Sequence, residues 1–142
     1  MAYKRVRKLK LADAAYITGL LDGEGTITLT REHADENRRL VISISNTDLS
    51  ILNLVRSTVG AGGTSKRTYS KRHTPSYAYK ITNRQALTLL NHIAKFLKSY
   101  KRDRAQLALR QYTAVTPRNG RYTPEQSSMR REFDKRFSAI VP

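Results

Sequence analysis

The nine residues from Ile17 to Gly25, ITGLLDGEG, place an acidic side chain beside a glycine at the predicted end of a helix. Glu24 stands just beyond that end, where the last backbone carbonyls have no partner within the helix. Carboxylate and carbonyl oxygens are the hard ligands that Mg²⁺ prefers. Gly19, on the helix itself, has no side chain, so a second backbone can approach closely. The stretch therefore offers oxygen ligands of the kind that a divalent metal takes.

The rest of the composition argues against other kinds of site. The chain has no cysteine, which excludes disulfides, thiolate zinc sites and a cysteine nucleophile. Its three histidines, His33, His73 and His92, lack the spacing of metal ligands, so a histidine-built site is not expected. No apolar run approaches the roughly 20 residues of a membrane span, and no apolar segment follows the basic N-terminus. We therefore expect an intracellular protein without a membrane partner.

Hydrophobic periodicity predicts the elements that must position this stretch. Helical spacing alternates with segments in which apolar and polar residues take turns, as in strands with one buried face. In chain order we expect a helix at 11–22, strands at 26–32 and 38–46, a helix capped by Thr47 or Asp48 and stopped by Gly60, strands at 64–72 and 76–82, a helix capped by Asn83, a helix at 101–115 and a helix that begins at Thr123. The fold class is α+β in the order αββαββα, with a four-stranded antiparallel sheet and appended C-terminal helices.

The two ends of the chain have separate signals. Residues 1–10 are basic and are expected to form a mobile arm, whereas residues 11–142 are expected to form one domain. Thr123 and Gln126 form a capping box, so the last helix is expected to bury Met129, Phe133 and Phe137.

The chain is strongly basic, with 27 Lys and Arg against 11 Asp and Glu and a formal net charge of +16. So much like charge repels itself unless a polyanion neutralises it, so nucleic acid is the first partner to expect and an anionic membrane the second. Between Leu40 and Arg102 the one acidic residue is Asp48, against eleven Lys and Arg. A sheet with helices on one face and a basic, hydroxyl-rich outer face suits the major groove of DNA.

The outward residues of the predicted strands are the candidates for reading DNA bases. They are Thr28, Thr30, Arg39, Val41, Ser43, Lys66, Thr68, Ser70, Arg72 and Lys80. A register shift of one residue would exchange the two faces. Arg5, Arg7 and Lys8 are expected to contact phosphates. Charge alone leaves DNA and RNA open, although the inward tyrosines argue against a sheet that stacks RNA bases.

The stretch ITGLLDGEG resembles the LAGLIDADG motif of homing endonucleases. Gly19, Leu20, Asp22 and Gly25 are identical to it, while Gly23 and Glu24 are substitutions that occur in the family. The resemblance extends from Leu11 to Tyr112, through the segments 46–49, 60–63 and 96–107. It implies the homing-endonuclease fold, here with a single motif copy and therefore one such carboxylate per chain.

By the resemblance, Glu24 is catalytic and binds Mg²⁺ together with the carbonyl of Gly23. Asp48 lies where the family places a polar residue that orders water or metal, and Lys101 matches a basic residue that stabilises charge at the phosphate. Both residues also have plain interpretations, since Asp48 is a good helix cap and Lys101 is one lysine among many. The resemblance places the dimer interface on the motif helix, at Ile17, Thr18, Gly19, Leu20 and Asp22, with Asp22 also capping or bracing the helices.

The hypothesis is a homodimeric, Mg²⁺-dependent, site-specific endonuclease that cuts both strands of a long pseudo-palindromic DNA target and is encoded in an intron or intein. The main alternative is a non-cleaving relative, either an RNA maturase or a DNA-binding regulator. A structural RNA-binding protein of the ribosomal type would explain the charge but not the motif.

Overall fold

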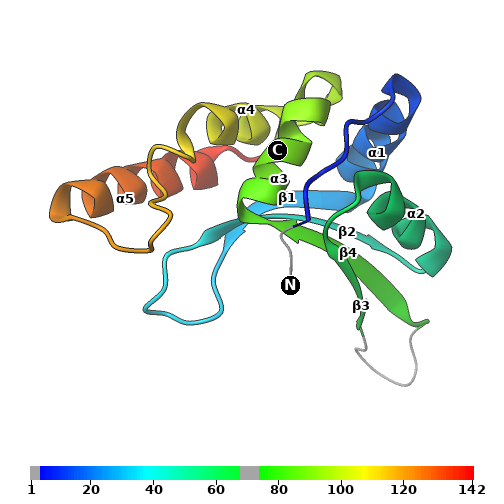
Figure 1. Ribbon diagram of the computed structural model, residues 1–142, viewed down its shortest axis with the longest axis horizontal. Helices are drawn as coiled ribbons and strands as arrows, with labels where there is room; N and C mark the ends of the chain where they lie inside the picture. Colours follow the sequence, from blue (N-terminus) through cyan, green and yellow to red (C-terminus); the bar gives the residue numbers. More distant parts are fainter. Residues whose placement is uncertain (1–3, 68–73) are drawn as a thin grey trace.

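The computed structural model describes residues 4–67 and 74–142, which form one antiparallel sheet with helices on one of its faces (Figure 1). In chain order the elements are α1 (Leu11–Glu24), β1 (Gly25–Thr30), β2 (Arg39–Asn46), α2 (Leu49–Val59), β3 (Gly63–Arg67), β4 (Ser76–Thr82), α3 (Asn83–Ile93), the short 3-10 helix η1 (Ala94–Phe96), α4 (Lys101–Gln111) and α5 (Pro124–Ala139). This order confirms the predicted α+β fold class with four antiparallel strands and additional C-terminal helices.

The strands lie in the order β1-β2-β4-β3, and every neighbouring pair is antiparallel. Cross-strand partners share a face, so the register separates two sets of residues. Ile27, Ile42 and Ile81 form one cross-strand row, and each is about 1 % exposed or less. Thr26, Ser43 and Lys80 form a row on the other face. One face is therefore apolar and covered, and we call the other the open face.

Three helices cover the apolar face (Figure 1). α1, α2 and α3 contribute Leu21, Leu52 and Leu90, all 0 % exposed, to a single core with the strand residues. Burial of this apolar surface is the main favourable contribution to folding. In the described part of the chain, no helix is long and apolar enough to cross a membrane.

The caps of two helices confirm the predictions made from sequence. The carboxylate of Asp48 accepts a hydrogen bond from the Ser50 amide at 2.9 Å, and Gly60 ends α2 with φ of 81°. Only a residue without Cβ takes that left-handed conformation without strain. Thr123 and Gln126 form the expected capping box at the start of α5. The cap expected at Asn83 is wrong, because Thr82 precedes α3 and the Asn83 amide oxygen instead accepts from the Tyr112 hydroxyl.

Two helices differ from the prediction in where they end or what they bury. α1 continues to Glu24, two residues past Asp22, so Glu24 is the last helical residue and not the first one beyond the helix. On α5, Phe133 and Phe137 are buried as expected, but Met129 is 49 % exposed and Arg130 is 1 % exposed. The prediction for Met129 is wrong because the buried stripe of α5 is Arg130, Phe133 and Phe137, one residue out of step with Met129.

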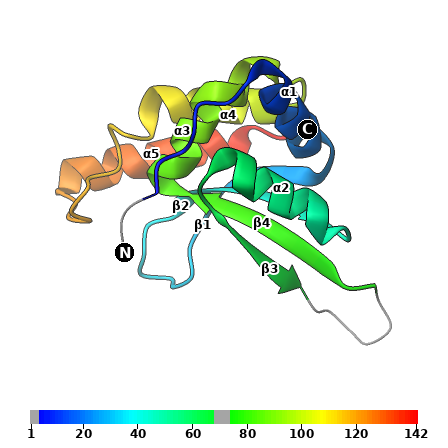
Figure 2. The same cartoon turned by 45° about the vertical axis from the view of Figure 1, so that its right-hand side comes forward.

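Residues 4–10, which are expected from their charge to form a mobile arm, contact the helical layer. The backbone amide of Arg7 donates to the Val59 carbonyl at 2.8 Å, and the carbonyl of Lys4 accepts from Gln85 at 2.6 Å. Val6 and Leu9 pack against the core. Figure 2 shows this segment running along the helical side beside α2 and α3. We call residues 4–10, which lie along the helical layer, the strap.

Candidate metal and nucleic-acid site

Two of the expected acidic residues meet at one end of the sheet, joined by an asparagine. The side-chain amide of Asn46 donates to Glu24 Oε2 at 2.7 Å, and its Oδ1 accepts from the Asp48 backbone amide at 2.8 Å. Asn46 thus connects the end of α1 to the start of α2. Both carboxylates are exposed. We call Glu24, Asn46 and Asp48 the acidic end of the sheet.

Asn46 is a site residue that sequence patterning misses. It is the last residue of β2, where strand alternation places no special demand on an amide. The interaction with Glu24 appears only when α1 and β2 are placed together. Asp48 is fixed by Ser50, whose hydroxyl donates to Oδ1 at 2.5 Å, and the hydrogen bonds from the Ser50 hydroxyl and amide hold the pKa of Asp48 below its usual value.

Lys101 lies beneath the C-terminal end of α1. Lys101 is 7 % exposed. Its ammonium group donates to the backbone carbonyls of Leu21 and Asp22 at 2.9 and 2.8 Å. A cation at the last carbonyls of a helix is favourable because it opposes the helix dipole. Burial lowers the pKa of Lys101, while the charge of Asp22 acts in the opposite direction. The structure thus places Lys101 near Glu24 but engages it with the motif helix.

Asp22 links the motif helix to the segment before α4. Its carboxylate accepts from the amides of Lys98 and Ser99 at 2.8 and 3.2 Å and from the Ser99 hydroxyl at 2.6 Å. Burial alone would raise the pKa of Asp22, but these hydrogen bonds and the charge of Lys101 together hold it below its usual value. Asp22 therefore has the bracing position expected for it.

The acidic end fits a divalent cation only in part within a single chain. Glu24 supplies an exposed carboxylate at the terminus of α1, next to the backbone of Gly23, and oxygen donors of this type suit Mg²⁺. Among residues 4–67 and 74–142, no three His, Cys, Asp or Glu side chains are grouped as a metal site. Further ligands would have to come from another molecule.

The exposed side of α1 differs from the interface expected for it. Ile17 and Thr18 are 1 % and 2 % exposed because they pack into the chain's own core, and the Thr18 hydroxyl donates to the Ala14 carbonyl at 2.6 Å. Asp22 faces the residues before α4. Of the five expected residues, Gly19 is exposed and Leu20 partly so. The free face is made of small residues and one aromatic residue: Ala12, Ala15, Tyr16, Gly19 and Gly23.

The open face carries most of the expected base readers from the first two strands and β4. Thr28, Thr30, Arg39, Ser43 and Lys80 all lie on it. Val41 is on this face too, although it is only 6 % exposed. The contact of all these residues with DNA stays a prediction.

The expected face of β3 is wrong by one residue. Lys66 pairs with Tyr77, which lies on the covered face, whereas Arg67 pairs with Ser76 on the open face. Arg67 Nη1 donates to Ser45 Oγ at 3.2 Å, and Ala78, which lies between their strands, is 0 % exposed. Both faces of this strand are polar, so alternation could not set the register. Thr68, Ser70 and Arg72 lie outside the described residues.

The strap places the three expected phosphate contacts on the helical layer. Arg5 and Lys8 are exposed there, and Arg7 Nη1 donates to the Ser57 carbonyl at 3.2 Å, at the C-terminal end of α2. Arg7 therefore stabilises that helix end. These side chains lie on the opposite side of the sheet from the open face.

Comparisons with known proteins bear on the fold and the family. Among solved structures, the chain is similar to the homing endonuclease I-CvuI in complex with the I-CreI target, with a TM-score of 0.73 and 17 % identity over 93 % of this chain and 85 % of that chain. It is also similar to the archaeal intron-encoded I-Vdi141I complexed with DNA, with a TM-score of 0.64 and 14 % identity over 92 % and 85 %. A third structure, the meganuclease I-AabMI bound to uncleaved DNA, gives a TM-score of 0.67 and 18 % identity over 91 % of this chain and 46 % of that chain.

At these identities the structures show a shared fold. Among curated protein sequences, none matches the chain significantly. A family model described as LAGLIDADG endonuclease matches residues 17–112, which is more than half of the chain. The chain therefore belongs to the LAGLIDADG endonuclease family.

Proposed function

We propose that this chain is a homodimeric, Mg²⁺-dependent, site-specific endonuclease that cuts both strands of a long pseudo-palindromic DNA target. The observation that carries the proposal is the position of Glu24. Its carboxylate is exposed at the last residue of α1, and the free face of this helix is not covered by the rest of the chain. Family membership and a net charge of +16 support the same conclusion. We further propose that the protein acts inside the cell, in the cytoplasm or nucleoid of a prokaryote or in an organelle, and that its gene lies in an intron or intein.

Dimerisation supplies what the single chain lacks. A Cβ built on Gly19 or Gly23 meets no atom within 4 Å, so both glycines face open space. Tyr16 is 48 % exposed on the same face, which makes this side of α1 apolar and closely approachable. An isologous contact through this face would bring two copies of Glu24 together about a two-fold axis, one for each DNA strand.

The donors at this junction would be the two Glu24 carboxylates and the Gly23 carbonyls. A divalent ion bound there would polarise the scissile phosphate and lower the pKa of a water nucleophile. The residues of this chain do the rest: Asn46 orients Glu24, and Lys101 holds the carbonyls that precede Gly23.

Double-stranded DNA is the proposed partner of the open face. The solved structures of I-CvuI, I-Vdi141I and I-AabMI with the same fold are DNA complexes. Arg67 and Lys80 offer donors to guanine edges, and Thr26, Thr28 and Thr30 offer hydroxyls. The length of the strands sets the length of duplex that the open face can contact.

A non-cleaving nucleic-acid-binding protein is the second candidate, and one observation favours it. The ammonium group of Lys101, expected to stabilise charge at the phosphate, already donates to two carbonyls and is nearly buried. A chain in which Lys101 serves only the helix end would bind DNA or RNA without cutting it.

The test begins with duplexes selected from a randomised pool by wild-type protein in Ca²⁺. These duplexes are then incubated with protein in Mg²⁺, using wild type, Glu24→Gln and the control Glu125→Gln on exposed α5. We expect double-strand cleavage by wild type and the control, and binding without cleavage by Glu24→Gln. Cleavage that survives Glu24→Gln would refute the site, and binding without cleavage by wild type would favour the second candidate.

A further inference from the structure

The most deeply buried polar side chain of α5 is an arginine that the proposed chemistry does not use. Arg130 is 1 % exposed, and its guanidinium lies over the rings of Tyr112 and Phe133, at 5.3 and 5.8 Å from the ring centroids. Burying a cation is unfavourable unless hydrogen bonds and a counter-charge replace its water. The partners of Arg130 therefore show what this arginine holds in place.

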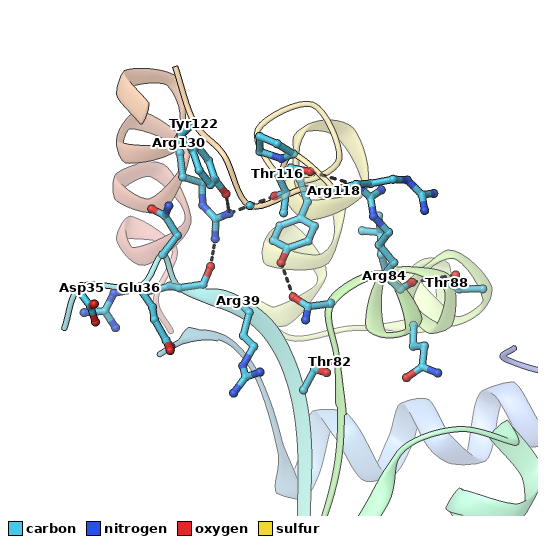
Figure 3. A pocket seen from close by; sticks show the side chains of 18 residues that line it. Asp35, Glu36, Arg39, Thr82, Arg84, Thr88, Thr116, Arg118, Tyr122 and Arg130 are labelled. Carbon is cyan, nitrogen blue, oxygen red and sulfur yellow. Dashed lines mark hydrogen bonds between the residues drawn. The ribbon is translucent and has the colours of Figure 1, made fainter. Parts of the chain in front are cut away.

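All three nitrogens of Arg130 have partners, and Figure 3 shows those of the two terminal nitrogens. Nε donates to Asp134 Oδ1 at 2.8 Å, and Nη1 donates to Thr116 Oγ1 at 3.1 Å and to the Tyr122 hydroxyl at 3.3 Å. Nη2 donates to the backbone carbonyl of Arg38. We call Arg130, Asp134, Thr116 and Tyr122 the Arg130 cluster. Three of the partners come from α5 or the segment before it, whereas the fourth is the residue that precedes β2.

A second side chain from the C-terminal half holds the same strand start. The Tyr112 hydroxyl accepts from the Leu40 amide at 3.2 Å and donates to Asn83 Oδ1 at 2.9 Å. β4 ends at Thr82, opposite Val41, so Leu40 lies one residue past the β2–β4 pairing. Arg130 and Tyr112 thus fix the backbone at two points where the loop from β1 joins β2.

The loop of residues 31–38 has few ties of its own. Arg31 donates to the Ala34 carbonyl at 3.1 Å, and Glu32 pairs with Arg39 at 2.9 Å, both at exposed positions. Exposed pairs of this kind contribute little to order. The direction of the loop is therefore set mainly at its ends, and the end at Arg38 is held by Arg130.

We propose that Arg130 is a positioning residue for DNA recognition: it fixes the backbone at Arg38 and so aims loop 31–38 and the Arg39 side chain at the outer base pairs of each half-site. The inference rests on the proposed function of the open face. Arg39 and Asn46 are seven residue steps apart on β2, or about 23 Å at ~3.3 Å per residue. At ~3.4 Å per base pair, this length corresponds to about seven base pairs. We therefore expect Arg130 to affect recognition of base pairs about that far from the acidic end.

α5 offers a matched pair of variants for the test. Arg130→Met with Asp134→Leu removes the buried ion pair without leaving either charge alone, and apolar replacements of buried pairs are often tolerated. Glu132→Leu with Arg136→Met removes an exposed pair at 3.1 Å with the same spacing on the same helix. Arg130→Lys keeps the charge but cannot reach all four acceptors, so it should behave like the double variant.

Two measurements distinguish the effect of Arg130 on the loop backbone from its effect on DNA recognition. Amide hydrogen exchange of the free proteins should show residues 38–40 exchanging about tenfold faster in the Arg130 variants, with α2 unchanged. Binding to a pool of duplexes randomised at single positions, in Ca²⁺, should show about tenfold weaker discrimination at the outer base pairs alone. Cleavage at the centre should match that of the Glu132 and Arg136 variant.

Each outcome decides a separate point. Unchanged exchange at residues 38–40 would overturn the role of Arg130 in holding the loop. Faster exchange with intact discrimination, or a loss spread evenly over all base pairs, would overturn its role in recognition and leave a structural one. A wild-type protein that prefers no sequence would refute the proposed function itself, and the exchange result would still decide whether Arg130 fixes the loop.

Discussion

The two ends of strand β2 hold their charged neighbours in opposite ways. Where the strand ends, the side-chain amide of Asn46 donates to the exposed Glu24 carboxylate and accepts from the backbone amide of Asp48, whose own carboxylate is also exposed. Where it begins, at Arg39, the nearby Arg130 is 1 % exposed and has a partner for each of its nitrogens. The charged groups at the end of β2, Glu24 and Asp48, are therefore exposed, whereas the charged group beside its start, Arg130, is buried.

This difference suits the two ends of β2 to different tasks, ligand binding at one and backbone positioning at the other. The exposed Glu24 carboxylate, with one amide partner, keeps oxygen lone pairs for a ligand. The buried guanidinium of Arg130 instead directs its N–H donors to acceptors within the chain. The acidic end is therefore suited to bind a cation. The Arg130 cluster is suited to hold a backbone in one position.

The change expected to have the largest effect is Glu24→Gln at the acidic end. The amide keeps the shape of the side chain but loses the charge that binds a divalent ion. We expect cleavage of a selected duplex to fall by about a thousandfold or more, because metal stabilisation of the transition state amounts to several kcal/mol. Affinity measured in Ca²⁺-free buffer should remain close to that of Glu125→Gln; a parallel loss of binding would mean that Glu24 serves recognition.

The second change tests whether two copies of Glu24 meet through the free face of α1. Gly19→Leu adds a side chain to the free face of α1, where a Cβ meets nothing within the chain. Leu also favours a helix over Gly by about 1 kcal/mol, so the monomer should stay folded. We expect monomers in sedimentation experiments and loss of double-strand cleavage. Ser138→Leu on exposed α5 is the control, and a Gly19→Leu dimer would place the interface elsewhere.

The third change loosens the acidic end without removing its charge. Asn46→Ala frees Glu24 from its only described side-chain donor. Groups that orient a metal ligand typically contribute 10–100-fold to activity, and we expect a decrease of about that size in the cleavage rate. Asn53→Ala, exposed on α2, is the matched control. An unchanged rate, with Glu24→Gln inactive, would show that Glu24 needs no help from Asn46.

The smallest effect is expected at Asp22, which braces α1. Asp22→Asn should lower the free energy of unfolding by about 1–2 kcal/mol at neutral pH, because charged hydrogen bonds to Ser99 and Lys98 are weakened. The pKa of Asp22 is lowered in the folded state, so its contribution is full above the ordinary value of 3.8 and disappears as the pH falls below it. Chemical denaturation from pH 7 to pH 3, with Asp35→Asn as control, should show the two curves converge; a constant gap would assign the loss to packing.

The sequence predicts the strands, their covered face and two helix caps because each depends on residues close together in the chain. The apolar rows of β1 and β2, the Asp48 cap and the capping box at Thr123 are of this kind. The acidic end is half predictable, since the motif points to Glu24 and the cap to Asp48. The bond between Asn46 and Glu24 joins residues 22 positions apart and has no local signal.

The errors share a physical origin, which is ambiguity between two faces. α1 carries apolar or small residues on both its covered and its exposed side. Periodicity could therefore not tell that Ile17 and Thr18 face the core and that Ala12 and Tyr16 face outward. β3 is polar on both faces, so the sequence placed Lys66 on the open face, where the structure has Arg67. On α5 the long stem of Arg130 and its acceptors from three segments make a buried position for a cation, which no helical pattern reveals.

The central claim is that two copies of Glu24 meet beside the DNA. The most direct measurement is a crystal structure of the wild-type chain with a selected duplex and Ca²⁺. We predict two chains packed through the Gly19 face of α1, with both Glu24 carboxylates bound to cations next to phosphates of opposite strands. A single chain on the duplex, or two Glu24 side chains turned away from the phosphates, would contradict the account.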